Sequence, residues 1–239
     1  MNLSMMFYGE PGMGKTVLAC SALDVPELNP VLLLDVESNV LSVKSKLNFI
    51  ELSELGKKTE SGKIDRVSIR STSDVQAVLD YLDANPNVYK TVAVDSLTEL
   101  SYVCLGEFAG KGKIRKKATE VTPFEIQHYG YNMLLLKQVL TFFKQLDVTV
   151  LYTALEDIDK IEGEVVMKVR PDFPGKLSRE LIAKVDIVGN LSIKPGSSAR
   201  EIRFQPTSRV VAKDQSENGK LGATMENPTM KKIMEKLNG

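Results

Sequence analysis

The sequence contains few of the residues that several classes of protein require. Its 239 residues include two cysteines, one histidine and no tryptophan. Because Cys20 and Cys104 lie far apart and form no C-x-x-C pair, a disulfide framework or a structural zinc site is not expected. The single histidine, His128, excludes a histidine-rich metal site and would be the only candidate base for a Ser-His-Asp triad.

The chain also lacks an excess of either charge and any long apolar run. Lys and Arg together number 31, as do Asp and Glu, so any nucleic-acid site would have to be a local patch. No apolar run approaches the roughly 20 residues of a membrane-spanning helix. The first residues, Met1–Tyr8, lack the charged region of a signal peptide. We therefore expect a cytoplasmic location.

Continuous apolar runs alternate with helical patterns along the chain. Unbroken apolar runs are typical of parallel strands that are covered on both faces. They occupy Leu3–Tyr8, Val31–Asp35, Val67–Ile69, Thr91–Asp95 and Val148–Thr153. Helical spacing of apolar residues predicts helices over Lys15–Leu23, Ser73–Leu82 (capped by Ser73 or Thr72) and Tyr131–Leu146. The sequence therefore predicts an α/β fold with a mainly parallel central sheet and helices on both faces.

The later part of the chain has a different pattern. Asp186–Lys194 and Arg200–Gln205 are joined by a Pro-Gly-Ser turn, which predicts an antiparallel hairpin extending the sheet. Glu156–Lys176 reads as a long polar loop. We expect residues 1–239 to form one domain, with a core over about 3–214 and a C-terminal loop and helix over 215–239. One apolar stripe is expected in the core: Leu134, Leu135, Val139, Phe142 and Phe143.

The strongest motif is a glycine-rich loop that follows the first predicted strand and begins a predicted helix. It fits G-x-x-x-x-G-K-[ST], whose backbone N–H groups cradle phosphates. Lys15 is expected to reach the β- and γ-phosphates, and the Thr16 hydroxyl is expected to bind Mg²⁺. The predicted ATP-binding residues in this loop are Gly9, Glu10, Pro11, Gly12, Met13, Gly14, Lys15, Thr16 and Val17.

Two further predicted strands end in carboxylates. Asp95 ends one of them, where a carboxylate could complete the Mg²⁺ shell as well as cap the next helix. Glu37 follows the other strand, and ligands bind at the carboxyl ends of parallel strands, so it is the candidate to activate water, with Asp35 as the next. A kinase could use the same carboxylate on an acceptor hydroxyl, so the reaction stays open.

This set of residues resembles the RecA-like ATPases, most closely the phage single-strand annealing ATPases that consist of a lone RecA core. In that superfamily the catalytic glutamate lies in an aspartate-x-glutamate sequence, as in Asp35-Val36-Glu37. The metal strand ends in aspartate-serine, as in Asp95-Ser96. The resemblance spans residues 3 to 214 and implies a RecA-like P-loop core, and host-cell cytoplasm if the protein is phage-encoded.

The resemblance also implies roles for two later residues. Val148–Thr153 resembles the sensor strand between the phosphate-loop and metal strands, which makes Thr153 the candidate to sense the γ-phosphate. Lys213 lies in a segment similar to the one that carries a basic finger in the family. Gln215 stands where related ring ATPases often have arginine, so Lys213 is the candidate catalytic cation across a subunit interface.

A basic segment follows the helix after the metal strand. A flexible stretch of this kind can neutralise DNA phosphates, although a solvated loop is the alternative interpretation. Its basic residues are Lys111, Lys113, Arg115, Lys116 and Lys117. Phe108, Phe124 and Tyr129 could stack on bases, although core packing is favoured for the last two and a structural role for His128.

The combined prediction is an ATPase that uses ATP and Mg²⁺ to control its binding of single-stranded DNA and promotes annealing or recombination. The implied partners are single-stranded DNA, a single-strand-binding protein and further copies of the chain in a ring or short filament. A P-loop small-molecule kinase and a nucleotide-switched protein-binding module remain the alternatives.

Overall fold

The computed structural model describes residues 3–57, 60–110, 124–160, 167–174, 177–194 and 196–239. One sheet runs through the molecule, with ten strands in the described part of the chain. The strands are β1 (Ser4–Tyr8), β2 (Val31–Asp35), β3 (Leu47–Phe49), β4 (Ile64–Ser68), β5 (Thr91–Asp95), β6 (Thr149–Ala154), β9 (Ile187–Ile193), β10 (Arg200–Arg203), β11 (Lys213–Asp214) and β12 (Thr224–Glu226).

The strand order is β12-β10-β9-β1-β6-β5-β2-β4-β3, and β11 also pairs with β9. All pairs from β9 across to β3 are parallel, whereas β10, β11 and β12 join by antiparallel pairing. The predicted mainly parallel sheet with an antiparallel C-terminal extension is confirmed. Strand β6 lies between β1 and β5, which is the place predicted for the sensor strand.

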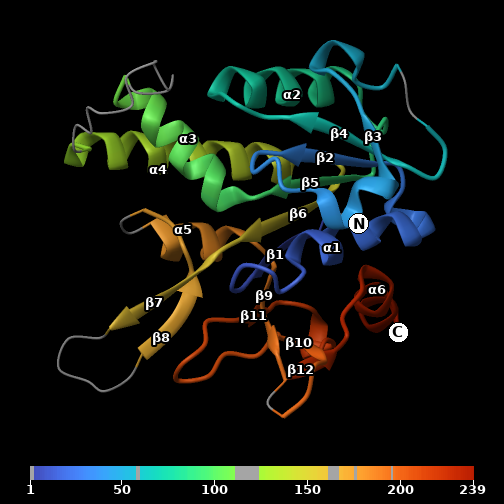
Figure 1. Cartoon of the computed structure of the whole chain (residues 1–239), viewed down its shortest axis with the longest axis vertical. Coiled ribbons are helices and arrows are strands. Elements are labelled where there is room, and N and C mark those ends of the chain that lie inside the picture. The colour runs from blue at the N-terminus through green and yellow to red at the C-terminus, as the bar shows by residue number, and fades with distance from the viewer. Residues whose placement is uncertain (1–2, 58–59, 111–123, 161–166, 175–176, 195) are drawn as a thin grey trace.

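Helices cover both faces of this sheet (Figure 1). Met6 and Tyr8 pack on one face with α2 to α5, and Met5 and Phe7 pack on the other with α1 and α6. Because both faces are covered, alternate residues are equally apolar, and the strand reads as an unbroken apolar run. The helices are α1 (Lys15–Cys20), α2 (Thr72–Ala84), α3 (Leu97–Phe108), α4 (Ile126–Gln145), α5 (Leu177–Lys184) and α6 (Met230–Asn238).

Three expectations about the helices are wrong in detail. Ser71 caps α2, because its side chain accepts a hydrogen bond from the Asp74 backbone N–H. Helix α1 ends at Cys20 and continues only as a 3-10 turn. Leu134 is 56% exposed on α4 and is not in the core.

The segment predicted as the polar loop Glu156–Lys176 contains a two-stranded antiparallel ribbon. Its strands are β7 (Glu156–Lys160) and β8 (Met167–Pro171). The Tyr8 hydroxyl donates a 2.5 Å hydrogen bond to the Val211 carbonyl, and Val211 N–H in turn bonds the Val169 carbonyl of β8. The ribbon is therefore tied to the end of β1, just before the glycine-rich loop.

No helix in the described ranges has the length and apolar character needed to cross a bilayer.

The start of β1 is tied to the start of β9 by Asp186. The Ser4 backbone N–H and hydroxyl donate to one carboxylate oxygen at 2.9 and 2.6 Å, and Lys144 Nζ donates to the other at 3.0 Å. Burial by itself would raise the pKa of Asp186, but the hydrogen bonds from Ser4 and Lys144 outweigh it, so the pKa lies below the ordinary value. The carboxylate therefore stabilises the fold when ionised.

Asp186→Ala is expected to lower the free energy of unfolding by about 1 to 3 kcal/mol at pH 7, because the buried Ser4 N–H loses its charged acceptor. A depressed carboxyl pKa gives stability above the unfolded pKa that is lost as the pH falls through the folded pKa. The difference from wild type should therefore shrink below about pH 4. Urea unfolding at several pH values measures it.

Lys144→Ala is the matched control, since it removes a half-exposed ion pair and a long 3.5 Å hydrogen bond to the Lys184 carbonyl and should cost less than about 1 kcal/mol. A constant difference between Asp186→Ala and wild type across the acid range would contradict the assignment.

Candidate active site

The glycine-rich loop occupies the position predicted for it, between β1 and α1. Two of its glycines are required by the local geometry. A Cβ on Gly9 would overlap the Leu191 carbonyl of β9, and Gly14 has φ +91° as the residue that precedes α1. Side chains are therefore excluded at both positions. The loop N–H groups and the first turn of α1 face the same edge of the sheet.

Lys15 is buried within this loop. Its Nζ donates to the carbonyls of Gly9 and Glu10, both at 2.9 Å. Burial lowers the pKa of Lys15, and the negative charges of Glu37, Asp95 and Glu156 partly offset this effect. The ammonium thus lies between the loop and nearby carboxylates, where it can meet the phosphates of a nucleotide.

Asp95 joins the loop to the central strands. The Thr16 hydroxyl donates to Asp95 Oδ2 at 2.7 Å, and the Thr153 hydroxyl donates to Oδ1. Burial raises the pKa of Asp95, and the two hydroxyl hydrogen bonds counteract it. The side chains predicted for the metal and for γ-phosphate sensing are therefore brought together around one carboxylate.

The donor set at this point suits magnesium. Thr16 and Asp95 present hydroxyl and carboxylate oxygens, which are the ligands that Mg²⁺ prefers. Among the described residues, no group of three or more His, Cys, Asp or Glu side chains could enclose a metal. An ion here would take its remaining ligands from water and phosphate oxygens, as a nucleotide-bound Mg²⁺ does.

Glu37 faces the loop across an open cavity of about 400 Å³. The Val36 and Glu37 N–H groups bond the Asp95 carbonyl at 2.8 and 3.4 Å, which holds the segment after β2 beside the end of β5. The lining residues include Pro11, Gly12, Gly14, Lys15, Thr16, Val17, Glu37, Asp95 and Arg200. Phosphate-binding groups and an exposed carboxylate therefore share one cavity.

Asp35, the second candidate to activate water, has a structural role. It is fully buried, and Arg66 Nε and Nη2 donate to its Oδ2 at 2.8 and 2.5 Å. The Ser38 N–H donates to the other oxygen at 2.8 Å. With both oxygens occupied and no access to the cavity, Asp35 cannot activate water, so the alternative assignment is wrong.

Sequence reasoning missed two residues near the loop, Arg200 and Glu156. Arg200 lines the cavity from β10, although nothing distinguishes it in sequence from other polar residues of the expected hairpin. Glu156 accepts a 3.3 Å hydrogen bond from Asn190 Nδ2, and burial raises the pKa of Glu156. Glu156 could have been found, because it follows β6 at the carboxyl end of a parallel strand.

Lys213 lies in β11, paired with β9, and its ammonium is already engaged. Its Nζ donates to the carbonyls of Ile182, Ala183 and Val185 at 3.3, 3.3 and 2.6 Å. These carbonyls lie at the C-terminal end of α5, where unpaired acceptors and the helix dipole favour a cation. The contacts give Lys213 a structural role within its own chain, and its action on a neighbouring subunit stays a prediction.

The predicted DNA-binding residues Lys111, Lys113, Arg115, Lys116 and Lys117 lie outside the described residues. The aromatic residues on either side of them are described. Phe108 is 39% exposed, and its ring centroid lies 5.8 Å from that of Tyr131. Phe124 is 36% exposed, and its ring centroid lies 6.2 Å from that of Tyr129. Core packing was therefore the wrong expectation for Phe124 and Tyr129.

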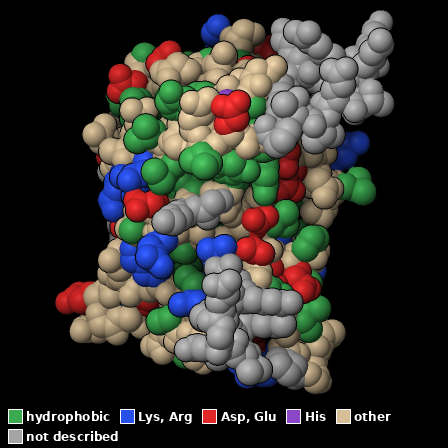
Figure 2. Space-filling model, turned by 90° about the vertical axis from the view of Figure 1, so that its left-hand side faces the viewer, with side chains coloured by type: hydrophobic (Ala, Val, Ile, Leu, Met, Phe, Trp, Pro, Cys, Tyr) green, Lys and Arg blue, Asp and Glu red, His purple; other side chains and the backbone are tan. Residues whose placement is uncertain are grey.

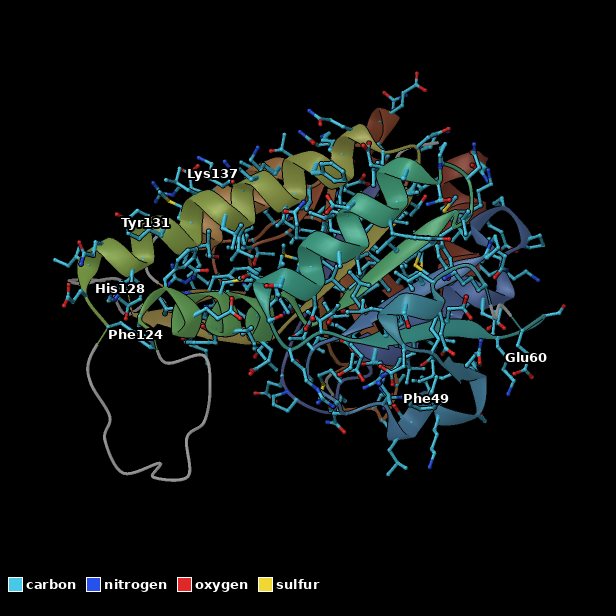
Figure 3. All side chains as sticks on the ribbon, turned by 90° about the horizontal axis from the view of Figure 1, so that it is seen from above. Phe49, Glu60, Phe124, His128, Tyr131 and Lys137 are labelled. Carbon is cyan, nitrogen blue, oxygen red and sulfur yellow. The ribbon has the colours of Figure 1, made fainter. Side chains whose placement is uncertain are left out.

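His128 has the structural role that was favoured for it. Its Nδ1 accepts a 3.0 Å hydrogen bond from the Glu125 N–H, which completes a capping box at the start of α4. Figure 3 shows Phe124, His128 and Tyr131 at the same end of α4.

Lys213→Met is expected to lower the free energy of unfolding by about 1 to 3 kcal/mol, because three helix-end carbonyls lose a charged donor. Lys231→Met, at an exposed position on α6, is the matched control and should leave stability unchanged. Chemical denaturation measures both. An unchanged unfolding midpoint together with lost ATP turnover would instead support a catalytic role.

The chain was compared with protein families, curated proteins and solved structures. Among solved structures, the chain is similar to a KaiC-like protein from the hyperthermophilic archaeon Pyrococcus horikoshii OT3, with 14% identity and a TM-score of 0.46, over 84% of this chain and 77% of that chain. No curated protein matches the chain. The model of the AAA domain family matches residues 1–216, which include the glycine-rich loop, Glu37 and Asp95. The chain therefore belongs to the AAA domain family of P-loop ATPases.

Proposed function

We propose that this protein hydrolyses ATP in the cavity beside Lys15 and binds single-stranded DNA at the outer end of α3 and α4, promoting annealing or recombination. The observation that carries the first part is the cavity itself. Lys15 and Thr16 begin α1, Asp95 ends β5 and Glu37 follows β2, and all four line this cavity. An anion-binding loop, a magnesium-type donor pair and an exposed carboxylate are the components of phosphoryl transfer to water.

Each component has a defined task in this reaction. The loop N–H groups and the Lys15 ammonium bind the phosphate chain and offset its charge. Thr16 and Asp95 would hold magnesium, which would supply Lewis-acid stabilisation of charge on the phosphates. Glu37 orients the attacking water molecule and accepts a proton from it. Its exposure to the open cavity leaves room for that water.

The tie between Thr153 and Asp95 supports coupling of this chemistry to the rest of the fold. Thr153 is the second-last residue of β6, and Leu155 leads directly into the β7–β8 ribbon, which begins at Glu156. A change in the ligands of Asp95 would therefore act on the root of the ribbon. Segments held by a γ-phosphate and its metal can relax after hydrolysis, which is how ATP would control binding of DNA.

Glu37→Gln is expected to bind ATP with near wild-type affinity and to lose about 10²- to 10⁴-fold in turnover, because the amide cannot accept the proton from water. Glu27→Gln, at an exposed position outside the cavity, is the matched control and should turn over normally. Single-turnover hydrolysis and calorimetric ATP binding separate the two effects. Undiminished hydrolysis by Glu37→Gln would contradict the proposed role.

Exposed aromatic rings support the proposed DNA site. Phe108, Phe124, Tyr129 and Tyr131 are between 36% and 54% exposed, and they adjoin both ends of the basic segment in sequence. In Figure 2 hydrophobic side chains gather close to the single histidine, and Lys and Arg side chains cluster further along the same face. Aromatic platforms beside basic residues are how proteins bind single strands without sequence preference.

The proposal includes two classes of protein partner. Further copies of the chain would form a ring or short filament, and a single-strand-binding protein would present the DNA. Such assembly would place a cation from one subunit near the phosphates of its neighbour, as proposed above for Lys213. Analytical ultracentrifugation with ATP and DNA tests the assembly directly.

Tyr131→Ala is expected to weaken binding of an oligothymidine by about 5- to 100-fold, because stacking of one base on an aromatic ring contributes about 1 to 3 kcal/mol. The salt dependence should stay unchanged. Leu134→Ala is the matched control, since Leu134 is equally exposed on the next turn of α4 but has no ring. Fluorescence anisotropy across a salt series measures both quantities.

The triple variant Lys113→Ala, Arg115→Ala and Lys117→Ala should change the salt dependence of DNA binding, which Tyr131→Ala leaves unchanged. Loss of up to three phosphate contacts flattens the logarithmic salt slope by about 2 on single strands. Wild-type affinity and slope in both the triple variant and Tyr131→Ala would place any DNA site elsewhere.

A further inference from the structure

Arg200 approaches the glycine-rich loop from the antiparallel extension of the sheet. Its guanidinium lies over Gly14: a Cβ at Gly14 would be 3.1 Å from Arg200 Nε and 3.4 Å from Cζ. The absence of a side chain at Gly14 therefore leaves room for the guanidinium as well as for the positive φ of the loop. This contact joins β10 to the residue immediately before Lys15.

The backbone of Arg200 is held on two sides. It pairs with Ile193 of β9, and its carbonyl accepts a 2.7 Å hydrogen bond from the Asn227 N–H. The Arg200 N–H donates to Asn227 Oδ1 at 3.3 Å. The side chain thus extends from a fixed strand rather than from a loop, so little ordering is needed to place it.

The guanidinium has no anionic partner in the part of the chain that the structure describes. Within the described residues, no hydrogen bond or ion pair involves the Arg200 side chain, although its strand neighbours Lys194 and Glu226 form an ion pair with each other. A guanidinium carries five N–H donors in a planar fork that matches phosphate oxygens. Unpaired guanidinium donors beside a phosphate-binding loop indicate that Arg200 binds an anionic group of the ligand.

Arg200 also lines two hollows. One is the cavity that contains Lys15, Thr16 and Glu37. The other, of about 170 Å³, shares Gly14, Val17 and Arg200 with the first and is further lined by Leu18, Leu191, Asn227, Pro228 and Thr229. A ligand that has its phosphates on the loop and continues into the second hollow passes directly along the guanidinium.

From this placement we propose that Arg200 binds the α- and β-phosphates of the nucleotide in its own subunit. The inference rests on the proposed ATPase function and adds a binding residue to it. Lys15 is expected to bind the β- and γ-phosphates, and both Lys15 and Glu37 line the first cavity. Arg200 lines that cavity and the second hollow as well. Arg200 therefore contributes equally to ADP and ATP binding and does not act on the transferred phosphate.

The test compares nucleotide affinities of wild type, Arg200→Ala, Arg200→Lys and Lys194→Ala in the full chain. Isothermal titration with ADP and with a non-hydrolysable ATP analogue gives the affinities, and steady-state turnover gives KM and kcat. Arg200→Ala should weaken both nucleotides by the same factor, about 10- to 100-fold, and raise KM with kcat nearly unchanged. Arg200→Lys should recover part of the loss, since it restores the charge without the fork.

Lys194→Ala is the matched control. It removes a cation from the same hairpin at a position outside both hollows and should bind nucleotides like wild type. Thermal unfolding of Arg200→Ala should match wild type, because the side chain is exposed.

Each result has a distinct consequence. Wild-type ADP and ATP affinities in Arg200→Ala would overturn the inference while leaving the ATPase proposal intact. A loss confined to the ATP analogue, with lower kcat, would also overturn it, because the contact would then be to the γ-phosphate. Failure of the wild-type chain to bind either nucleotide would overturn the proposed function together with the inference.

Discussion

The hydrogen bonds of Thr16 and Thr153 to the buried Asp95 are the interaction on which the site depends. The Asp95 carboxylate accepts one hydrogen bond from the Thr16 hydroxyl of α1 and another from the Thr153 hydroxyl of β6. Burial disfavours the ionised form of Asp95, and the two hydroxyl hydrogen bonds stabilise that form. The same carboxylate is the group proposed to hold magnesium, so binding of a nucleotide must rearrange the contacts that join β5, β6 and α1.

A second constraint acts from the other side of the loop. The Leu191 carbonyl of β9 leaves no room for a side chain on Gly9, and Arg200 of β10 lies over Gly14. The antiparallel extension is therefore a wall of the nucleotide site as well as an edge of the sheet. Close backbone packing restricts how far the loop can move, which favours a preformed phosphate cradle.

The proposed DNA surface consists of exposed side chains, whereas the nucleotide site is built on buried ones. Its rings are exposed at the end of α3 and α4, away from the apolar layers that cover the sheet (Figure 3). Exposure of the Tyr131 ring to water is unfavourable in the isolated chain, and stacking on bases is one way to cover it. The ribbon that follows Thr153 and the Tyr8 hydrogen bond to Val211 connect the nucleotide site to neighbouring segments.

The amino-acid sequence by itself determined the parallel core and the phosphate loop. Unbroken apolar runs require strands buried on both faces, and the spacing from Gly9 to Thr16 is a local property of a strand, a turn and a helix. Glu37 and Asp95 could be predicted because carboxyl ends of parallel strands converge on one edge. Only the tertiary structure decided that Asp35 pairs with Arg66, that Lys213 binds the end of α5 and that Arg200 faces Gly14. These partners are separated by between 28 and 186 residues, and which charged side chain meets which group depends on strand order and register, which local patterns do not encode.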